Sequence, residues 1–224
     1  MSGGRAVGRG LKMFLQNKGP AFIKFGQLLS YLPTLDADIR AELATLRDKA
    51  NIPARDELFE ILKMALPESE MNKISYVGKL LGAGSFYITV QIVYDGRPCV
   101  ISVMRPYAHE LTASGVDMIA RTINDLVAAG KKFAPLQNIL NQARESAFSE
   151  IDIEQDYQKY KHAKHVYEQY SVTAGDATYS PDVAQWLAYG AAENGANAYK
   201  IMEMASGHSL TFDGWTEQEK HDFA

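Results

Sequence analysis

Residues 20–30 combine a cation, a glycine and an amide at a spacing that suits recognition of a polar ligand. Pro20 favours a helix start, because its missing N–H would be unpaired at the first helical position anyway. Lys24 and Gln27 are three apart and therefore share one helix face. Gly26 lies between them, and a mid-helix glycine costs about 1 kcal/mol relative to alanine. We therefore expect a close approach to the backbone at Gly26; the alternative is a surface helix with an incidental glycine.

A second candidate segment is a small-residue turn between two strand-like runs. Small residues let backbone N–H groups approach phosphate oxygens, as in the glycine-rich loops that cover nucleotides. The alternative is an ordinary hairpin, which also uses glycine freely. The residues that we assign to this candidate nucleotide-binding turn are Gly82, Ala83, Gly84 and Ser85.

Two acids form the third candidate feature. Glu150 and Asp152 are two apart in a polar stretch that we predict to be one long helix, from Pro135 to about Tyr170. On a helix they would not share a face, so one could reach Lys24 while the other faces solvent or a metal. Charges on a polar helix are the alternative. His162 and His165 have no third ligand at metal spacing, so we predict no protein metal site.

Hydrophobic periodicity places these features on a defined order of elements. Before residue 70 the pattern predicts short helices, and then the period changes from 3.6 to about 2, which predicts strands. Asp95-Gly96 is a hairpin signal. The predicted helices cover the N-terminal residues, 20–30, 36–49, 55–66, 109–132 and 135–170; the predicted strands cover 74–81, 86–94, 98–104, 183–189 and 199–204.

Three strands, a helix pair and two more strands form the order of a protein-kinase small lobe. We predict an α+β fold: a helical extension over residues 1–70, then a small lobe with an antiparallel sheet of about five strands over 71–215. Residues 216–224 would begin a further helix, since Thr216-Glu217-Gln218-Glu219 looks like a capping box.

Four segments resemble the UbiB/AarF family of atypical kinase-like proteins. Residues 19–30 resemble its "GPxFIKxGQxxS" signature, 96–106 its "GREVAVKVQRP" pattern, 150–152 its E-x-D motif and 202–210 its hinge pattern "MExxxGxxL". The resemblance covers roughly residues 19–215. It implies that the K-x-G-Q helix (Lys24, Gly26 and Gln27) lies over a nucleotide site. It further implies that Glu150 and Asp152 interact with that helix and the metal–nucleotide region, and that Glu203 and Met204 lie at the hinge.

The chain departs from the family at Ser102, which stands where the pattern "VAVK" has its lysine. That lysine pairs the phosphates with a helix glutamate, for which Glu145 is our candidate. A serine hydroxyl carries no charge; we hypothesise that Lys24 supplies a substitute. The glycine-rich turn departs too: Tyr87 holds the third glycine position of kinases, and UbiB proteins favour an alanine-rich loop here.

The sequence contains no H-x-D catalytic loop and no D-F-G-type metal site after the hinge. We therefore assign no catalytic residue and expect either a fragment of a longer gene product or a degenerate relative with no large lobe. The resemblance implies ATP and Mg as ligands, weakly bound or absent in this chain. It also implies ATPase or small-molecule kinase activity of the complete protein in support of prenyl-quinone metabolism.

Composition allows a second reading, a non-catalytic pseudokinase-like module that binds membrane lipid or a partner protein. The first helix is basic and amphipathic, with Val7, Leu11, Phe14 and Leu15 on one face and Arg5, Arg9, Lys12 and Gln16 on the other. Its alternative is a solvated helix packed on its own domain. We expect no nucleic-acid partner, and the single Cys99 fits a reducing compartment. No apolar run reaches the ~18 residues of a membrane span, so we expect an intracellular protein, cytoplasmic or peripheral on a membrane (mitochondrial or plastid in a eukaryote).

Overall fold

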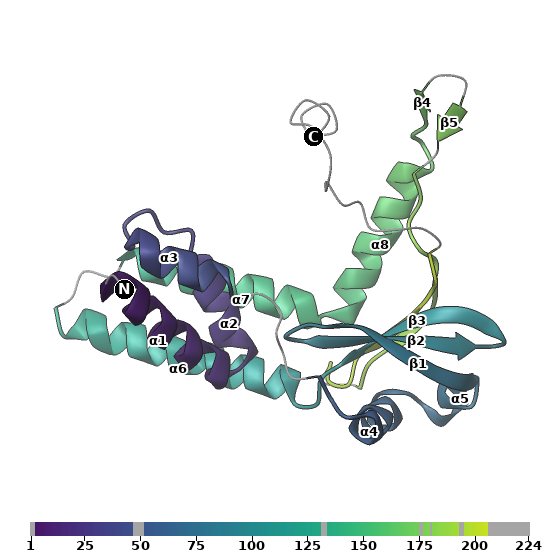
Figure 1. The fold of residues 1–224 in the computed structure, drawn as a ribbon, viewed down its shortest axis with the longest axis horizontal. Coiled ribbons are helices and arrows are strands. Elements are labelled where there is room, and N and C mark those ends of the chain that lie inside the picture. Colours follow the sequence, from purple (N-terminus) through teal and green to yellow (C-terminus); the bar gives the residue numbers. More distant parts are fainter. Residues whose placement is uncertain are drawn as a thin grey trace.

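The computed structural model describes residues 3–46, 52–130, 134–174, 177–179, 181–192 and 195–205. Helices α1, α2, α3, α6 and α7 gather on one side of the molecule, the sheet lies on the other with α4 and α5 beside it, and α8 rises from the junction (Figure 1). The helices are α1 (Gly3–Lys18), α2 (Pro20–Leu29), α3 (Ala37–Ala44), α4 (Arg55–Ala65), α5 (Glu68–Met71), α6 (Ala108–Ala128), α7 (Ala134–Ile151) and α8 (Ile153–Tyr167). The strands are β1 (Ile74–Ala83), β2 (Tyr87–Tyr94), β3 (Arg97–Met104), β4 (Val172–Ala174), β5 (Ala177–Tyr179), β6 (Trp186–Gly190) and β7 (Tyr199–Glu203).

The main sheet has five antiparallel strands in the order β1-β2-β3-β7-β6. This confirms the predicted α+β class with a kinase-like small lobe. The β2–β3 hairpin turns at Asp95-Gly96, where φ is 48° and 75°; these positive values are those of the tight turns that Asp-Gly favours. Burial alternates along β2, because successive side chains point to opposite faces.

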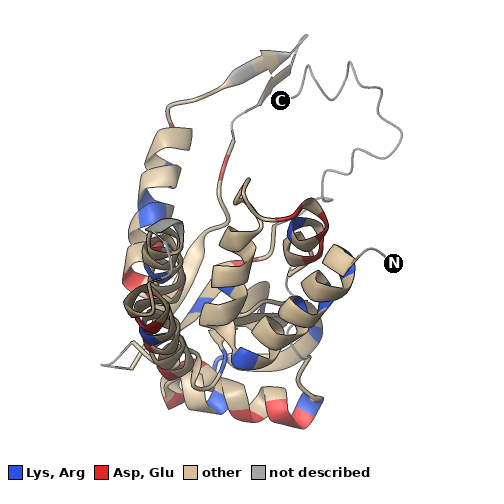
Figure 2. Cartoon of the chain, turned by 90° about the vertical axis from the view of Figure 1, so that its left-hand side faces the viewer, with Lys and Arg blue, Asp and Glu red and all other residues tan. Residues whose placement is uncertain are grey.

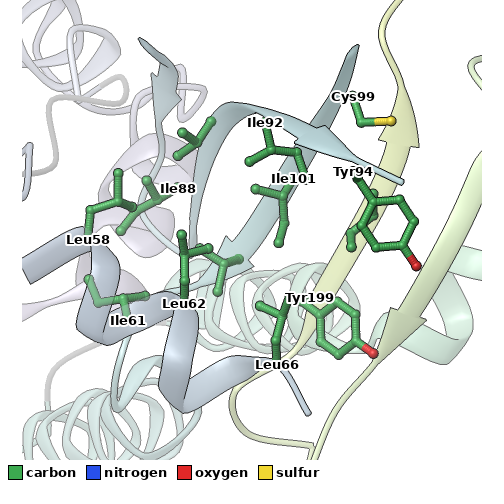
Figure 3. Close-up of a cluster of buried hydrophobic side chains, with 13 residues drawn as sticks. Leu58, Ile61, Leu62, Leu66, Ile88, Ile92, Tyr94, Cys99, Ile101 and Tyr199 are labelled. Atoms are coloured by element: carbon green, nitrogen blue, oxygen red, sulfur yellow. The ribbon is translucent and has the colours of Figure 1, made fainter. Parts of the chain in front are cut away.

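Helix α4 covers one face of the sheet. Its side chains Leu58, Ile61 and Leu62 are buried against strand residues such as Ile88 and Ile101 (Figure 3). Because Ile88 and Ile101 are completely inaccessible to solvent, this face is a dry core. The opposite face is mixed: Met104 of β3 is buried there in an apolar cluster, and the neighbouring Ser102 points to the same side.

Helices α1, α2, α3, α6 and α7 share a second core. Its buried members from α2 are Ala21, Phe22 and Phe25, and α6 and α7 contribute Val116 and Leu140. Helix α2 packs directly against both α6 and α7. This core therefore holds the K-x-G-Q helix to the helices that lead into the sheet.

The prediction of one long helix over residues 135–170 is wrong, because the helix is interrupted between α7 and α8. The side chains of Ile151 and Ile153 are both buried, at 3% and 8% exposure, in one cluster beside the sheet. Residues two apart do not share a helix face, so a continuous helix could not bury both. Asp152 lies between them and caps α8, its carboxylate accepting a hydrogen bond from the Gln155 N–H at 2.9 Å.

Several boundaries differ from the sequence-based expectation. The strand predicted over residues 183–189 begins at Trp186, and the helix predicted over 36–49 is described only as α3. The short α5 and the β4–β5 hairpin were not predicted. The hinge residues 206–210 and the expected capping box at 216–219 lie outside the described residues.

The apolar face that the sequence indicated for α1 is only partly buried. Leu15 is buried, but the side chains of Val7 and Phe14 are exposed at 59% and 52%. The basic side instead meets α3, with Arg9 Nε 3.6 Å from a Glu42 carboxylate oxygen. Acidic and basic residues are interspersed over the helices (Figure 2). Among the described residues, no helix combines the length and apolar character needed to cross a membrane.

Candidate functional site

The K-x-G-Q helix begins where the sequence predicted. Gly19, with φ of 103°, turns the chain sharply out of α1, and Pro20 opens α2. A φ of this sign is costly for residues with a Cβ, so glycine suits the corner. The apolar side of α2 faces the helical core, which leaves Lys24 and Gln27 on the side toward the sheet.

Gly26 is a close-packing position, and this confirms the expected approach to its backbone. A Cβ at Gly26 would lie 2.5 Å from Leu46 Cδ1 and 2.6 Å from Leu15 Cδ1. Next to it, the Gln27 amide donates a 2.7 Å hydrogen bond to the Leu46 carbonyl. Gly26 and Gln27 thus fasten α2 to α1 and to the end of the α3 segment, whereas Lys24 remains available for contacts across the site.

Lys24 forms an ion pair with Glu150 near the end of α7. The Lys24 side chain is 19% exposed and that of Glu150 is 44% exposed, so the pair lies at the edge of the protein interior. The first acid of the E-x-D motif therefore contacts the K-x-G-Q lysine. The second acid, Asp152, is occupied as the cap of α8 and does not share this contact in the structure.

Helix α2 and the β1–β2 turn enclose a small cleft of about 240 Å³. Its walls bring together three segments that are far apart in the sequence. They are formed by Pro20, Lys24 and Gln27 of α2, by Gly84, Ser85, Phe86 and Tyr87 of the turn and β2, and by Glu150 of α7. Cation, amide, hydroxyl and small-residue backbone thus converge on one space.

Hydrogen bonds fix the backbone of the β1–β2 turn, while the space next to its glycines is free. The Gly84 N–H donates to the Tyr87 carbonyl at 2.8 Å, and Arg105 Nε donates to the Gly84 carbonyl at 2.8 Å. A Cβ on Gly82 would meet no atom within 4 Å. Neither Gly82 nor Gly84 has a positive φ, so the local conformation does not demand glycine. Because glycine has no side chain, the space next to the turn stays free at these two positions.

Ser102 does not line this cleft. It lies on β3, only 6% exposed, and its hydroxyl pairs with that of Thr89 at 2.9 Å. Glu145, our candidate partner for a strand lysine, is exposed on α7. Of the two hinge residues, Glu203 accepts a hydrogen bond from the Gln185 N–H at 2.9 Å, and the Met204 sulfur lies 3.8 Å from the Gln91 amide. Ala83 ends β1.

The sequence did not predict a cluster of charged and aromatic side chains on the face of the sheet opposite α4. Lys200 of β7 is 2.5 Å from an Asp156 carboxylate oxygen of α8 and lies over the Trp186 ring at 4.8 Å. Tyr157 of α8 stacks on Tyr189 of β6 with ring centroids 4.2 Å apart. The tyrosine spacing along α8 was a visible signal, but its partners come from distant strands.

Tyr87 links this cluster to the cleft. Burial raises the pKa of its phenol, and the negative charges of Asp156 and Asp152 raise that pKa further. The phenol therefore stays protonated at neutral pH and lies within electrostatic reach of both acids. His162 and His165 are exposed on α8, and no group of three or more metal-ligating side chains forms among the residues that the structure describes.

The fold and these contacts define a class: a kinase-like small lobe carrying a helical extension whose Lys24 lines a cleft together with the β1–β2 turn. Comparison with known proteins gives the family. Over 155 residues the chain is 30% identical to a probable protein kinase UbiB of Cellvibrio japonicus, a match that covers 66% of this chain and 28% of that protein. The chain is thus related to the UbiB family over about two thirds of its length, which confirms the resemblance.

Other relatives with the same name agree. A probable protein kinase UbiB of Xylella fastidiosa is 33% identical over 102 residues, covering 44% of this chain and 18% of that protein. One from Shewanella is 27% identical over 154 residues, covering 65% and 28%. No protein-family model matches the chain. The matched region therefore spans less than a third of the length of these curated relatives.

Proposed function

We propose that this chain is the nucleotide-covering part of a UbiB-like atypical kinase and binds ATP–Mg between α2 and the β1–β2 turn. The observation that carries the proposal is the convergence of Lys24, Gln27, Gly84 and Ser85 on one cleft. An ammonium and a hydroxyl are donors that phosphate oxygens need, and Lys24 and Ser85 carry them here, whereas the Gly84 N–H is already bonded to the Tyr87 carbonyl. In the whole protein this binding would serve ATPase or small-molecule kinase chemistry in prenyl-quinone metabolism.

The residues around the cleft fit a magnesium nucleotide. Mg²⁺ usually keeps several waters and is held by one or two carboxylates together with the phosphates of the substrate. Glu150 lines the cleft, and Asp152 follows two residues later. When bound, the ion would neutralise phosphate charge. The chain's own part is to position the phosphates through Lys24 and the turn.

Thermal unfolding with and without ATP–Mg tests the proposal. A ligand at 100 times its dissociation constant stabilises the folded state by about 2.7 kcal/mol, which raises the Tm of a chain of this size by several degrees. We expect this shift for the unaltered chain and a much smaller one for Lys24→Ala.

Lys63→Ala is the matched control for that experiment. Lys63 also forms an ion pair, at 2.9 Å with Glu60, but on α4, whose residues do not line the cleft. Its shift with ATP–Mg should equal that of the unaltered chain. Absence of any shift in the unaltered chain would contradict nucleotide binding, and an unchanged shift in Lys24→Ala would remove Lys24 from the site.

A second candidate function, docking of α1 on a membrane surface, is favoured by the exposed side of that helix. Val7, Met13 and Phe14 are 59%, 62% and 52% exposed, and Lys18 lies 5.5 Å from the Phe14 ring centre. Apolar side chains beside a cation suit the boundary of an anionic bilayer. Arg5 and Arg9 are less available, since Glu42 lies against both.

Sedimentation with anionic lipid vesicles tests this second function. Replacing Met13 and Phe14 by serine should abolish binding, whereas neutralising Arg5, Arg9 and Lys12 should weaken it modestly. Binding should also fall as salt screens the charges. If the double serine variant sediments as the unaltered chain does, α1 is not the docking element.

A further inference from the structure

Ser102 stands where the family pattern has a lysine, and the position of Lys200 in the sheet indicates another residue that could supply that positive charge. In the β3–β7 ladder the Cα partner of Ser102 is Lys200, and in the β2–β3 ladder its partner is Thr89. Residues directly opposite in antiparallel strands point to the same face, with Cβ atoms about 4.5–5.5 Å apart. Thr89, Ser102 and Lys200 therefore form one row across three neighbouring strands.

This row lies on the face of the sheet opposite the dry core. Side chains alternate along a strand, and the immediate neighbours Ile101, Val103 and Ile201 belong to the core cluster under α4. The Thr89–Ser102 hydroxyl pair shows that the row is polar. A lysine at Ser102, as the family pattern has it, would thus emerge beside Lys200.

The Lys200 ammonium has the kind of partner that the strand lysine of a kinase has. In kinases the β3 lysine pairs with a carboxylate from a helix that crosses the sheet. Here Asp156 of α8 lies 2.5 Å from Lys200 Nζ, and the Lys200 side chain is 21% exposed. The Trp186 ring at 4.8 Å fixes the cation further.

Tyr87 connects the polar row to the cleft, because it precedes Thr89 by two residues on β2 and therefore points to the same face of the sheet. Tyr87 lines the cleft, and the Asp156 charge acts on its phenol. Lys200 and Asp156 do not line the cleft themselves; Tyr87 is the residue that the cleft and this face of the sheet share. We propose that Lys200 of β7 supplies to the nucleotide phosphates the positive charge that Ser102 of β3 lacks, with Asp156 as its partner. This inference rests on the proposed nucleotide binding.

Calorimetric titration of the 224-residue chain with ATP–Mg and with adenosine tests the assignment. Lys200→Met should weaken ATP–Mg binding at least tenfold and leave the affinity for adenosine within twofold, because the lost charge acts on phosphates alone. Returning the charge to β3, in the double variant Ser102→Lys with Lys200→Met, should recover ATP–Mg affinity to within about threefold of the original. A purely structural lysine would show neither the phosphate selectivity nor the rescue.

Lys73→Met is the matched control. Lys73 also has an acid at 2.9 Å, Glu70, and an aromatic ring, Tyr94, at 5.5 Å from the ring centre, but it lies outside the polar row. The Lys73→Met variant should bind ATP–Mg as tightly as the unaltered chain does. If Lys200→Met fails to fold, Lys200→Gln and Asp156→Asn replace it. Each of these variants should weaken the binding of ATP–Mg but not the binding of adenosine.

The outcomes separate the two proposals. If the unaltered chain binds ATP–Mg and Lys200→Met binds it equally well, the assignment of Lys200 is overturned and the proposed function stands. Equal losses for ATP–Mg and adenosine would also overturn it, as a structural effect. If the unaltered chain binds no ATP–Mg, both the proposed function and this inference fall.

Discussion

Two glycines of the helical region and two of the β1–β2 turn have opposite surroundings. A Cβ on Gly115 of α6 would lie 2.8 Å from the Ala21 Cβ, and one on Gly26 would lie 2.5 Å from Leu46 Cδ1. By contrast, a Cβ on Gly82 would meet nothing within 4 Å, and one on Gly84 only the Tyr87 carbonyl at 3.6 Å. A side chain therefore has no room at Gly26 or Gly115, whereas it has room at Gly82 and Gly84.

This difference separates glycines that build the site from glycines that keep it accessible. Close helix contacts at Gly26 and Gly115 bring α2 against α1 and α6, and so determine where Lys24 points. At the turn, no close neighbour and no positive φ requires glycine, so substitutions there test for contact with a ligand and not for packing. Variants of the two pairs should therefore fail in different measurements.

Gly115→Val should have the largest effect on stability. Its new side chain would meet the Ala21 Cβ, a short rigid group that cannot rotate away. Overpacking of this kind costs about 1–3 kcal/mol, and we expect the upper end in chemical denaturation. Gly10→Val is the control, since Gly10 is also helical but has no atom within 4 Å of its Cβ position. Equal stability of the two variants would contradict a close α2–α6 contact.

Gly26→Val should cost less, about 1–2 kcal/mol, because the groups it meets are the ends of two leucine side chains that can shift. Its second effect is on the site. Displacing α2 moves Lys24 relative to Glu150, so the Tm shift with ATP–Mg should shrink even where the protein is fully folded. A Gly26→Val protein with normal stability would mean that Leu15 and Leu46 repack freely.

Local features of this fold could be predicted from the sequence because their causes are local. A run rich in Val, Ile and Tyr predicted β2, the Asp95-Gly96 pair predicted its hairpin, and Pro20 with helical spacing predicted α2. The unusual glycine at position 26 correctly indicated a close contact. For β2, its hairpin and α2 the signal lies within a few residues along the chain. Gly26 indicated a close contact but not its partners, Leu15 and Leu46, which come from other segments.

The remaining features depend on contacts between distant segments. Lys200 and Asp156 are 44 residues apart, and their pairing follows from strand register, which a single sequence does not reveal. The break at Asp152 arises because Ile151 and Ile153 both enter one cluster, a tertiary demand that overrides a helical pattern. For the same reason the sequence did not predict that α3 lies against the side of α1 that carries Arg5 and Arg9.

Gly82→Ala should change stability least, by less than about 0.5 kcal/mol, as for surface substitutions without packing consequences. The added methyl meets no protein atom within 4 Å, so any loss of ATP–Mg affinity reflects contact with the ligand itself. We expect a severalfold loss in calorimetric titration, with an unchanged Tm in the absence of nucleotide. An affinity equal to that of the unaltered chain would show that the phosphates do not pass over Gly82. The turn would then be an ordinary hairpin, and the cleft beside Lys24 and Gly84 would have to hold the nucleotide without it.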